Sequence, residues 1–486
     1  MPALRRPPTP LLVLVACAWL LLVDPPSVAD SAGTAPGASA SPAGGAPFEG
    51  FGVSGAWWAR DTGRLPTVTR DRIAGLLFSP SGLRLSMYRY NIGGGGWVAQ
   101  RARFAPGFLR SDGSYNWSAD AAGRDMLARA AAMGVPRLVA FANAAPPEFT
   151  SNGLGCAGTL RADRVAEYAS YLSRVVVHFA AAGARFDLVS PMNEPDSAFS
   201  SCTQEGMAVP VALRGPLIDA LQAALARRGS SAGVLADESG TAGGLLSESP
   251  GWVDARPRVL AYHAYDNPSL QRLQQVAALS GNVGRPAYMS EVCCLVDGHF
   301  RQGFHPRMLG ALWMAHAIWR NLAVGGASSF SWWVALSPEL GCDARLSSCG
   351  TRSNGLGWDD GLVYYDRDYR SDGNRRLVLT KRYWAYAQFT RWIRPGMAPH
   401  AVTGDTGGAR VLVYTGRGRT VVVAIAPRHL VTSLSLGLPW LGSATASVTQ
   451  TSRLLSDAPL QPLPVDAGTL SAQLPAGSVT TFVIPG

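Results

Sequence analysis

Two glutamates, Glu194 and Glu291, follow apolar, β-prone runs at residues 187–190 and 287–290. If two such strand ends converge, one protonated carboxyl group can donate a proton to a leaving group while an ionised one attacks an anomeric carbon. Two converging carboxyl groups are the minimal equipment for cleaving a glycosidic bond. Asn193, directly before Glu194, adds an amide that can hold a substrate hydroxyl. The Asn-Glu-Pro tripeptide alone is better explained by a capping amide and a solvated acid, so the hypothesis depends on the surrounding elements.

Short apolar runs alternate with amphipathic helical patterns from residue 48 to about residue 395. The predicted strands are residues 50–54, 83–90, 137–141, 187–190, 233–236, 259–263, 287–290 and 327–332. The predicted helices are residues 70–78, 120–133, 163–182, 213–228, 270–278, 306–323 and 381–393. This alternation predicts an α/β fold, a (β/α)₈ TIM barrel, in which strands four and seven face each other and chemistry is done at the carboxyl ends of the strands. A doubly wound open sheet is the alternative, but the first strand-to-helix turn lacks its G-x-G-x-x-G fingerprint.

Aromatic and polar residues at other strand ends are of the kinds that bind a sugar. Aromatic faces stack on the apolar faces of a pyranose, and Arg, Asn and His side chains hold its hydroxyls. The predicted substrate-binding residues are Trp57, Arg89, Asn91, Asn143, Asn193, His263, Tyr265, Trp332 and Trp333. Each alone has a structural explanation: a Trp pair is more often core, a lone His is usually hydrogen-bonded in a core, and Arg89 could pair with a carboxylate. Asp237 and Glu238, after the fifth strand, are expected to be structural or to support the site.

Several motifs together resemble those of glycoside hydrolase family 30. They are GFGVSGAWW at 50–58, RYNIGGG at 89–95, FANAAPP at 141–147, SPMNEP at 190–195, TQEG at 203–206, YMSE at 288–291 and the segment 389–396. The resemblance covers roughly residues 48–486, and RYNIGGG, Asn-x-x-Pro-Pro and Gln-Glu-Gly are most similar to the endo-β-1,6-galactanases, which cut the galactan side chains of arabinogalactans. It implies that Glu194 is the acid/base, that Glu291 is the nucleophile, that the anomeric configuration is retained and that Asn193 holds the sugar 2-hydroxyl.

The sequence departs from that family pattern at two places. Glu148 and Phe149 follow the Pro-Pro where relatives usually have bulky aromatics, which bears on the choice of substrate. Many relatives also begin with a strand that joins the C-terminal β domain, and here an Ala/Gly/Ser-rich stretch is expected to replace it. A β-1,6-glucanase, a xylanase, a β-fucosidase or a β-galactosidase stays an alternative, as does a non-catalytic carbohydrate-binding protein, which the presence of both glutamates disfavours.

The two ends of the chain differ from the barrel in composition. Residues 1–29 are typical of a secretory signal with cleavage near Ala29, which predicts a secreted protein without membrane attachment. Residues 30–47 are rich in Ala, Gly, Ser and Pro and predict a disordered tether before a catalytic barrel at residues 48–397. In residues 398–486, β-prone runs separated by Gly, Pro and Asp predict an antiparallel β-sandwich domain.

Cysteine usage and charge narrow the possible partners and cofactors. Six cysteines follow the signal, and an even count in an exported chain favours disulfides. Cys342 with Cys349 is the expected pair, Cys156 with Cys202 is a guess from neighbouring loops, and Cys293 and Cys294 either pair or stay reduced. The net charge of +10 comes from scattered arginines, with a single lysine, so we expect no nucleic-acid partner. We expect a monomer that acts on a polysaccharide and uses neither metal nor cofactor.

Overall fold

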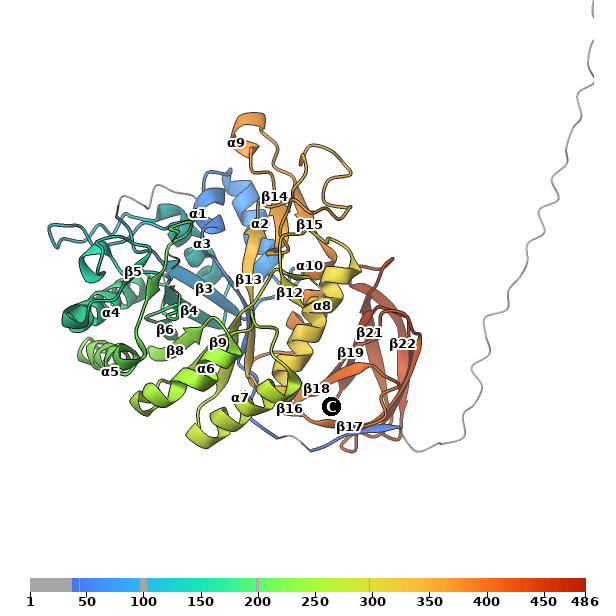
Figure 1. The fold of residues 1–486 in the computed structure, drawn as a ribbon. Coiled ribbons are helices and arrows are strands. Elements are labelled where there is room, and N and C mark those ends of the chain that lie inside the picture. The colour runs from blue at the N-terminus through green and yellow to red at the C-terminus, as the bar shows by residue number, and fades with distance from the viewer. Residues whose placement is uncertain (1–36, 43, 97–102, 198, 200, 297) are drawn as a thin grey trace, which may run out of the picture. The chain divides into compact units, whose positions relative to one another are not determined.

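The computed structural model describes residues 37–42, 44–96, 103–197, 199, 201–296 and 298–486, so the predicted signal at residues 1–29 lies outside the described residues. The described chain holds two ten-stranded sheets, one in the barrel and one in the C-terminal β domain (Figure 1). In this part of the chain, none of the helices combines the length and the apolarity needed to cross a membrane.

The first sheet contains the parallel strands of a closed barrel, which confirms the predicted fold class. Strand β10 pairs with β13 and so closes the ring, whereas a doubly wound sheet would leave two open edges. The barrel strands are β2 (Gly50–Ser54), β3 (Met87–Ile92), β4 (Arg137–Ala142), β6 (Leu188–Ser190), β8 (Gly233–Ser239), β9 (Val259–His263), β10 (Ala287–Glu291) and β13 (Ser329–Ser337). Every predicted strand is present, with boundaries that differ by a few residues.

Helices follow the strands around the barrel (Figure 1). They are α1 (Trp58–Thr62), α2 (Thr67–Phe78), α3 (Ala121–Ala132), α4 (Val165–Ala181), α5 (Val211–Arg227), α6 (Ala242–Glu248), α7 (Leu270–Val283), α8 (Met308–Trp319), α9 (Tyr369–Asp372) and α10 (Lys381–Thr390). Asp120 caps α3 as its sequence position predicts, because its side chain accepts a hydrogen bond from the Gly123 N–H. The helix α6 was not predicted, since Gly243 and Gly244 weaken its local helical signal.

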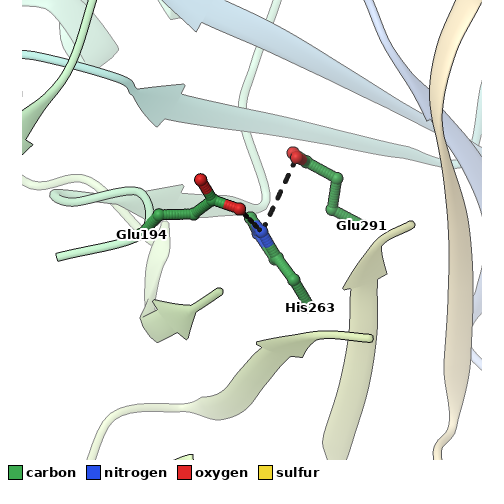
Figure 2. Close-up of side chains that lie close together, drawn as sticks. All are labelled: Glu194, His263 and Glu291. Carbon is green, nitrogen blue, oxygen red and sulfur yellow. Dashed lines mark hydrogen bonds and ion pairs between the residues drawn. The ribbon is translucent and has the colours of Figure 1, made fainter. Parts of the chain in front are cut away.

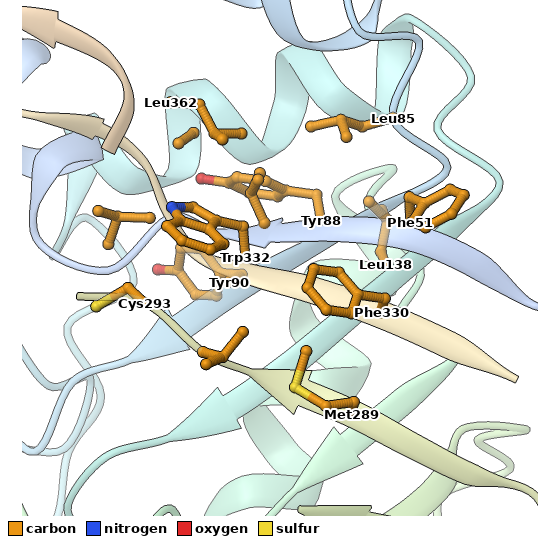
Figure 3. Close-up of a cluster of buried hydrophobic side chains, with 14 of the residues drawn as sticks. Phe51, Leu85, Tyr88, Tyr90, Leu138, Met289, Cys293, Phe330, Trp332 and Leu362 are labelled. Carbon is orange, nitrogen blue, oxygen red and sulfur yellow. The ribbon is translucent and has the colours of Figure 1, made fainter. Parts of the chain in front are cut away.

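Alternate residues of strands β3, β4, β6, β8, β9 and β10 enter two different cores. Met87, Val139 and Tyr288 belong to a cluster inside the barrel. Tyr88, Tyr90, Phe330 and Trp332 belong to the larger cluster of buried side chains that Figure 3 shows. This period of two follows from the strand geometry and decides which strand-end side chains can reach the barrel mouth.

Two extensions rise from the carboxyl ends of the barrel strands. A hairpin of β11 (Leu295–Val296) and β12 (His299–Phe300) follows β10. Strand β13 also pairs with β14 (Gly361–Tyr365), which pairs with β15 (Leu377–Leu379).

Three disulfides tie loops of the barrel. Cys342 with Cys349 and Cys156 with Cys202 are both bonded, which confirms the two predicted pairs. The adjacent Cys293 and Cys294 bond to each other, which decides between the two alternatives.

The second sheet forms the predicted C-terminal β domain and is mostly antiparallel. Its strands are β1 (Ala38–Ala40), β16 (Ala398–His400), β17 (Val402–Gly404), β18 (Arg410–Gly416), β19 (Arg419–Ile425), β20 (Thr432–Gly437), β21 (Ala444–Thr451), β22 (Ala458–Asp466), β23 (Thr469–Leu474) and β24 (Val479–Pro485). Strand β22 contains Pro459 and Pro464, which weaken its local strand signal.

The stretch predicted as a disordered tether, residues 30–47, contains a strand of this domain. Strand β1 pairs in parallel with β20 and antiparallel with β17, and Ala38 and Ala40 are buried. The prediction of disorder was therefore wrong for residues 38–40, as was the expectation that this chain lacks an N-terminal strand in the β domain, while residues 30–36 lie outside the described part of the chain. Small side chains give a weak local strand signal, and the backbone pairing with distant strands stabilises β1 instead.

Candidate active site

Glu194 and Glu291 converge above the carboxyl ends of the barrel strands, on either side of His263 (Figure 2). Glu291 is the last residue of β10, and Glu194 lies four residues beyond β6. One side-chain atom from each of the three residues lies within 4.8 Å of the other two. The His263 Nδ1 lies 3.0 Å from the Glu194 Oε1 and 3.6 Å from the Glu291 Oε1. The predicted meeting of the two strand-end carboxyl groups is therefore present.

Arg89 lies buried behind Glu291 and joins two carboxylates. Its Nη1 donates to the Glu291 Oε2 at 2.9 Å and its Nη2 donates to the Glu238 Oε2 at 2.5 Å. The guanidinium also lies 4.3 Å from the centre of the Phe141 ring. Two buried carboxylates require a counter-charge, which Arg89 supplies. We correct its predicted role accordingly, from contact with substrate to support of Glu291.

His263 is also buried, beneath the two glutamates. Burial alone would lower its pKa, but Glu291, Glu194 and Glu238 outweigh burial and raise the pKa of His263 to about 10. The imidazole is therefore protonated at neutral pH and can donate to the Glu194 carboxylate. Its Nε2 lies 3.4 Å from the Glu238 Oε2, so both ring nitrogens face carboxylates. This residue too supports Glu194 and Glu291 rather than lining the cavity above them.

The environment of Glu291 contains opposing influences on its charge. Burial raises the pKa of Glu291, and the neighbouring Glu194 adds to that rise. His263 and Arg89 oppose the rise, and the Tyr265 hydroxyl donates to the Glu291 Oε1 at 3.0 Å. Two cations and one neutral donor therefore surround this carboxyl group and favour its ionised form.

The backbone at the site is held in an unusual conformation. Glu194 and Glu238 have φ angles of +44° and +59°, and Trp57 has +63°. Residues other than glycine rarely adopt this left-handed region, and they do so chiefly where the surrounding structure fixes them, often at functional sites. Of the three, Glu194 and Trp57 line the cavity, whereas Glu238 lies within β8 and contacts Arg89 and His263.

A cavity of about 1410 Å³ lies over the glutamate pair. Its walls include five of the predicted substrate-binding residues, namely Trp57, Asn143, Asn193, Tyr265 and Trp333, as well as Glu194 and Glu291. The volume exceeds the roughly 300–1,000 Å³ of ordinary small-ligand pockets and leaves room for several sugar residues.

Two features of these walls suit a sugar. The Trp57 and Trp333 rings meet edge to face at 5.3 Å and form one aromatic wall. The buried Asn193 Oδ1 has no hydrogen-bond partner among the residues that the structure describes, so it can accept a hydrogen bond from a bound hydroxyl.

Trp332, which we predicted to bind substrate, lies in the core instead. It is 1% exposed and its Nε1 donates to the backbone oxygen of Asp360. Neighbouring residues of a strand point to opposite sides, so Trp333 reaches the cavity while Trp332 packs among the side chains of Figure 3. Of the Trp332 and Trp333 pair, Trp332 is therefore a core residue.

Glu205 organises the cavity wall, and sequence reasoning gave it no role. Its Oε1 accepts hydrogen bonds from Asn91 Nδ2 at 2.5 Å, Trp57 Nε1 at 3.1 Å and Asn143 Nδ2 at 3.5 Å. Asn91 is thus buried behind the wall and does not line the cavity, which corrects its predicted contact with substrate. The Gln-Glu-Gly motif was the only signal for Glu205, and it carried the family resemblance without indicating a function.

The acidic pair after the fifth strand divides into two roles. Asp237 forms an ion pair with Arg214 at 2.7 Å, away from the cavity, and burial raises the pKa of Asp237 to about 6. Glu238 joins Arg89 to His263, as described above. The expectation of structural and supporting roles agrees with these contacts.

Glu194, His263 and Glu291 also form a donor set that could hold a divalent cation. However, the protonated His263 lacks a free lone pair at Nδ1, and the Arg89 guanidinium places a further positive charge against Glu291. The local charge therefore disfavours a metal ion at this position.

Comparisons with known proteins agree with this geometry. Residues 46–260 match the family model "O-Glycosyl hydrolase family 30". An endo-β-1,6-galactanase from Hypocrea rufa is 24% identical over 491 aligned residues, which cover 90% of this chain and 92% of the relative.

Two solved structures share the fold at 20% identity, each over 92% of this chain. A conserved exported protein from Bacteroides fragilis has a TM-score of 0.78 over 99% of its own chain. The catalytic domain of a family 30 xylanase C from Talaromyces cellulolyticus has a TM-score of 0.70 over all of its chain (100%).

Proposed function

We propose that this chain, an O-glycosyl hydrolase of family 30, cleaves β-1,6-linked galactan and retains the anomeric configuration by double displacement. The observation that carries the proposal is the convergence of Glu194 and Glu291, with side-chain oxygens within 4.8 Å of each other, at the floor of a cavity with aromatic and amide walls. The positive charge of Arg89 beside Glu291 favours the ionised form that a nucleophile requires, which supports Glu291 in that role.

The proposed reaction has two steps, in which Glu194 acts first as an acid and then as a base. In the first, the Glu291 carboxylate attacks the anomeric carbon while Glu194 donates a proton to the departing glycosidic oxygen. In the second, Glu194 takes a proton from water, which attacks the same carbon and releases Glu291. Retaining enzymes hold their carboxyl groups roughly 5–5.5 Å apart and inverting ones roughly 6.5–9.5 Å apart, so the close approach of this pair favours retention.

The choice of galactan rests on two observations. The motifs at residues 89–95, 141–147 and 203–206 resemble those of endo-β-1,6-galactanases, and the relative from Hypocrea rufa carries that name. A β-1,6-glucanase, a xylanase, a β-fucosidase and a β-galactosidase are the rival activities, because the same pair of glutamates serves each of them. The linkage that is cleaved depends on which sugar oxygen leaves with the proton from Glu194.

Linkage analysis of products from a panel of β-1,6-galactan, β-1,6-glucan and xylan tests the substrate. We expect β-1,6-galacto-oligosaccharides, and products from another polysaccharide alone would overturn the choice of galactan. Proton NMR of the first product formed tests the stereochemistry, and an initial α-anomer would contradict double displacement.

Two variants test the assignment of the nucleophile. Glu291→Ala is expected to abolish turnover and keep the fold, as measured by circular dichroism, whereas Glu167→Ala, at an exposed glutamate on α4, should keep full activity. Near-native activity of Glu291→Ala would refute the assignment. Binding of galactan without hydrolysis by the unaltered protein would instead support a carbohydrate-binding protein.

We further propose that the protein works outside the cytoplasm. The three disulfides in the described residues support this location, since such bonds persist chiefly in oxidising compartments. Fractionation of the source cells should recover the activity in the culture medium, and activity confined to the cytoplasm would contradict the proposal.

A further inference from the structure

We propose that three aromatic rings, those of Tyr265, Phe300 and Trp358, form a sugar-binding subsite that extends from the cleavage point along one wall of the cavity. The proposal rests on the proposed function and deepens it, because it assigns a place for a sugar residue that is not itself cleaved. All three residues line the cavity over the glutamates.

The rings form a continuous series that begins at Glu291. The Tyr265 hydroxyl donates to the Glu291 Oε1 at 3.0 Å, which fixes the first ring beside the reacting centre. The Tyr265 and Phe300 ring centroids are 5.7 Å apart, and those of Phe300 and Trp358 are 5.6 Å apart. Each step is within the usual separation of interacting aromatic side chains, so the rings support one another as a single surface.

The rings come from three separate segments of the chain. Tyr265 follows β9, Phe300 ends the hairpin of β11 and β12, and Trp358 lies before β14. The hairpin is fixed at its base, since the Arg301 N–H donates to the Cys294 backbone oxygen and Cys294 is bonded to Cys293. Both cysteines are buried and line the same cavity, so an apolar disulfide lies between Glu291 and the hairpin.

The exposure of Phe300 indicates a ligand. Its side chain is 56% exposed although it contacts two other rings, so most of its apolar face is left to solvent. Exposed hydrophobic side chains that stand alone need no explanation, whereas grouped ones mark binding sites. Phe300 belongs to the second case, because it contacts the Tyr265 and Trp358 rings.

A polar group stands close to the end of this series. Asp360 follows Trp358 by two residues and lines the cavity, and its buried Oδ1 has no hydrogen-bond partner within the described chain. A pyranose offers both an apolar face, which packs on aromatic rings, and hydroxyls, which donate to a carboxyl oxygen. The combination of a largely apolar wall and one oriented polar atom is what ligand pockets use to select and orient a ligand.

Kinetics on two chain lengths test the subsite. For Phe300→Ala and Trp358→Ala, we expect the ratio of kcat/KM on β-1,6-galactotetraose to that on β-1,6-galactobiose to fall about tenfold relative to the unaltered protein. Leu454→Ala, at an exposed side chain far from the cavity residues in sequence, should leave this ratio unchanged. A ratio within twofold of that of the unaltered protein in both cavity variants would overturn the subsite.

Binding measurements separate failure of the subsite from failure of the proposed function. Calorimetry would compare Glu291→Ala with the double variant Glu291→Ala/Phe300→Ala, using galacto-, gluco- and xylotetraose as probes. If the unaltered protein hydrolyses no galactan, only the proposed substrate is refuted. The subsite is supported if the double variant binds its preferred tetraose about tenfold more weakly, and it is refuted if the affinity is equal or no tetraose binds.

Discussion

Replacement of Glu205 tests whether one buried carboxylate positions the aromatic and amide wall of the cavity. Its Oε1 accepts from three side chains, those of Trp57, Asn91 and Asn143, and its Oε2 faces the backbone N–H groups of Gly94 and Ala105, each at 3.4 Å. Burial raises the pKa of Glu205, while these donors favour the ionised form. No other single residue described above contacts both cavity-lining partners, Trp57 and Asn143.

The expected magnitude follows from counting acceptors. In Glu205→Gln, one amide oxygen can keep the Asn91 and Trp57 hydrogen bonds, but the amide N–H₂ then faces two backbone donors. Leaving buried donors without an acceptor costs about 1–3 kcal/mol, so we expect a loss of about 2 kcal/mol in the free energy of unfolding. In Glu205→Ala every donor except Asn143, which also donates to the Asn91 Oδ1 at 3.2 Å, loses its acceptor. A cavity also forms, so we expect a loss of about 4 kcal/mol.

The effect on catalysis should differ between the two variants. Glu205→Gln keeps the Trp57 indole bonded, so its KM should stay within about threefold of the unaltered value. Glu205→Ala releases Trp57 and removes one of the two acceptors of the Asn143 amide. A resulting loss of about 1.4 kcal/mol in substrate binding corresponds to a tenfold increase in KM. Because Glu194 and Glu291 are untouched, kcat should fall less than KM rises.

The assay combines urea unfolding with steady-state kinetics at a temperature where every variant is folded. Glu167→Gln and Glu167→Ala serve as controls, because Glu167 is an exposed glutamate that forms a surface ion pair with Arg164. Each control should change stability by less than about 0.5 kcal/mol. An unchanged KM for folded Glu205→Ala would refute the positioning role. Equal destabilisation by the Gln and Ala variants would refute the acceptor argument.

Three further predictions concern the groups that support the glutamates. Arg89→Gln leaves Glu291 buried with less counter-charge, so the acidic limb of the kcat/KM profile should move to higher pH and stability should fall by about 3–5 kcal/mol; an unmoved limb would contradict this. The pKa of His263 is about 10 in the folded protein and about 6.5 in the unfolded chain. The difference in the free energy of unfolding between the unaltered protein and His263→Asn should therefore be full below pH ~6.5 and should disappear as the pH rises through 10. Urea unfolding at pH 6, 8 and 10 measures it, and a constant difference would exclude it. The Cys156–Cys202 bond spans 46 residues, so Cys156→Ala/Cys202→Ala should lose about 4 kcal/mol in the free energy of unfolding. Urea unfolding measures this loss, and an unchanged free energy would contradict the prediction.

Local patterns in the sequence were sufficient to predict the barrel and the convergence of Glu194 and Glu291. Apolar runs of strand length alternating with helical periods predict parallel strands, and a closed barrel brings the ends of strands four and seven to one mouth. Glu194 and Glu291 could therefore be paired although they lie 97 positions apart in the chain (291 − 194 = 97). The loop cysteines could be paired for a similar reason, since they lie in short or neighbouring loops.

Local patterns failed where a side chain's partner is distant in the chain. The sequence shows an Arg and an Asn at the end of β3, but not that Arg89 pairs with Glu291, 202 residues away, or Asn91 with Glu205, 114 residues away. These pairings draw both side chains behind the cavity wall. The sequence did not predict β1 for the same reason, because its backbone partners lie in the C-terminal domain.

The sequence by itself determined the class of fold and placed both glutamates at strand ends, since hydrophobic periodicity and chain direction are local properties. Only the tertiary structure decided which strand-end residues face the cavity and which support it from behind. Trp332 and Trp333 differ by one position and point to opposite sides, and the register shift between β13 and β2 beyond Trp332 belongs to the pairing of two strands. Burial of carboxylates, and the cations that compensate them, exists only once segments far apart in the chain have packed together.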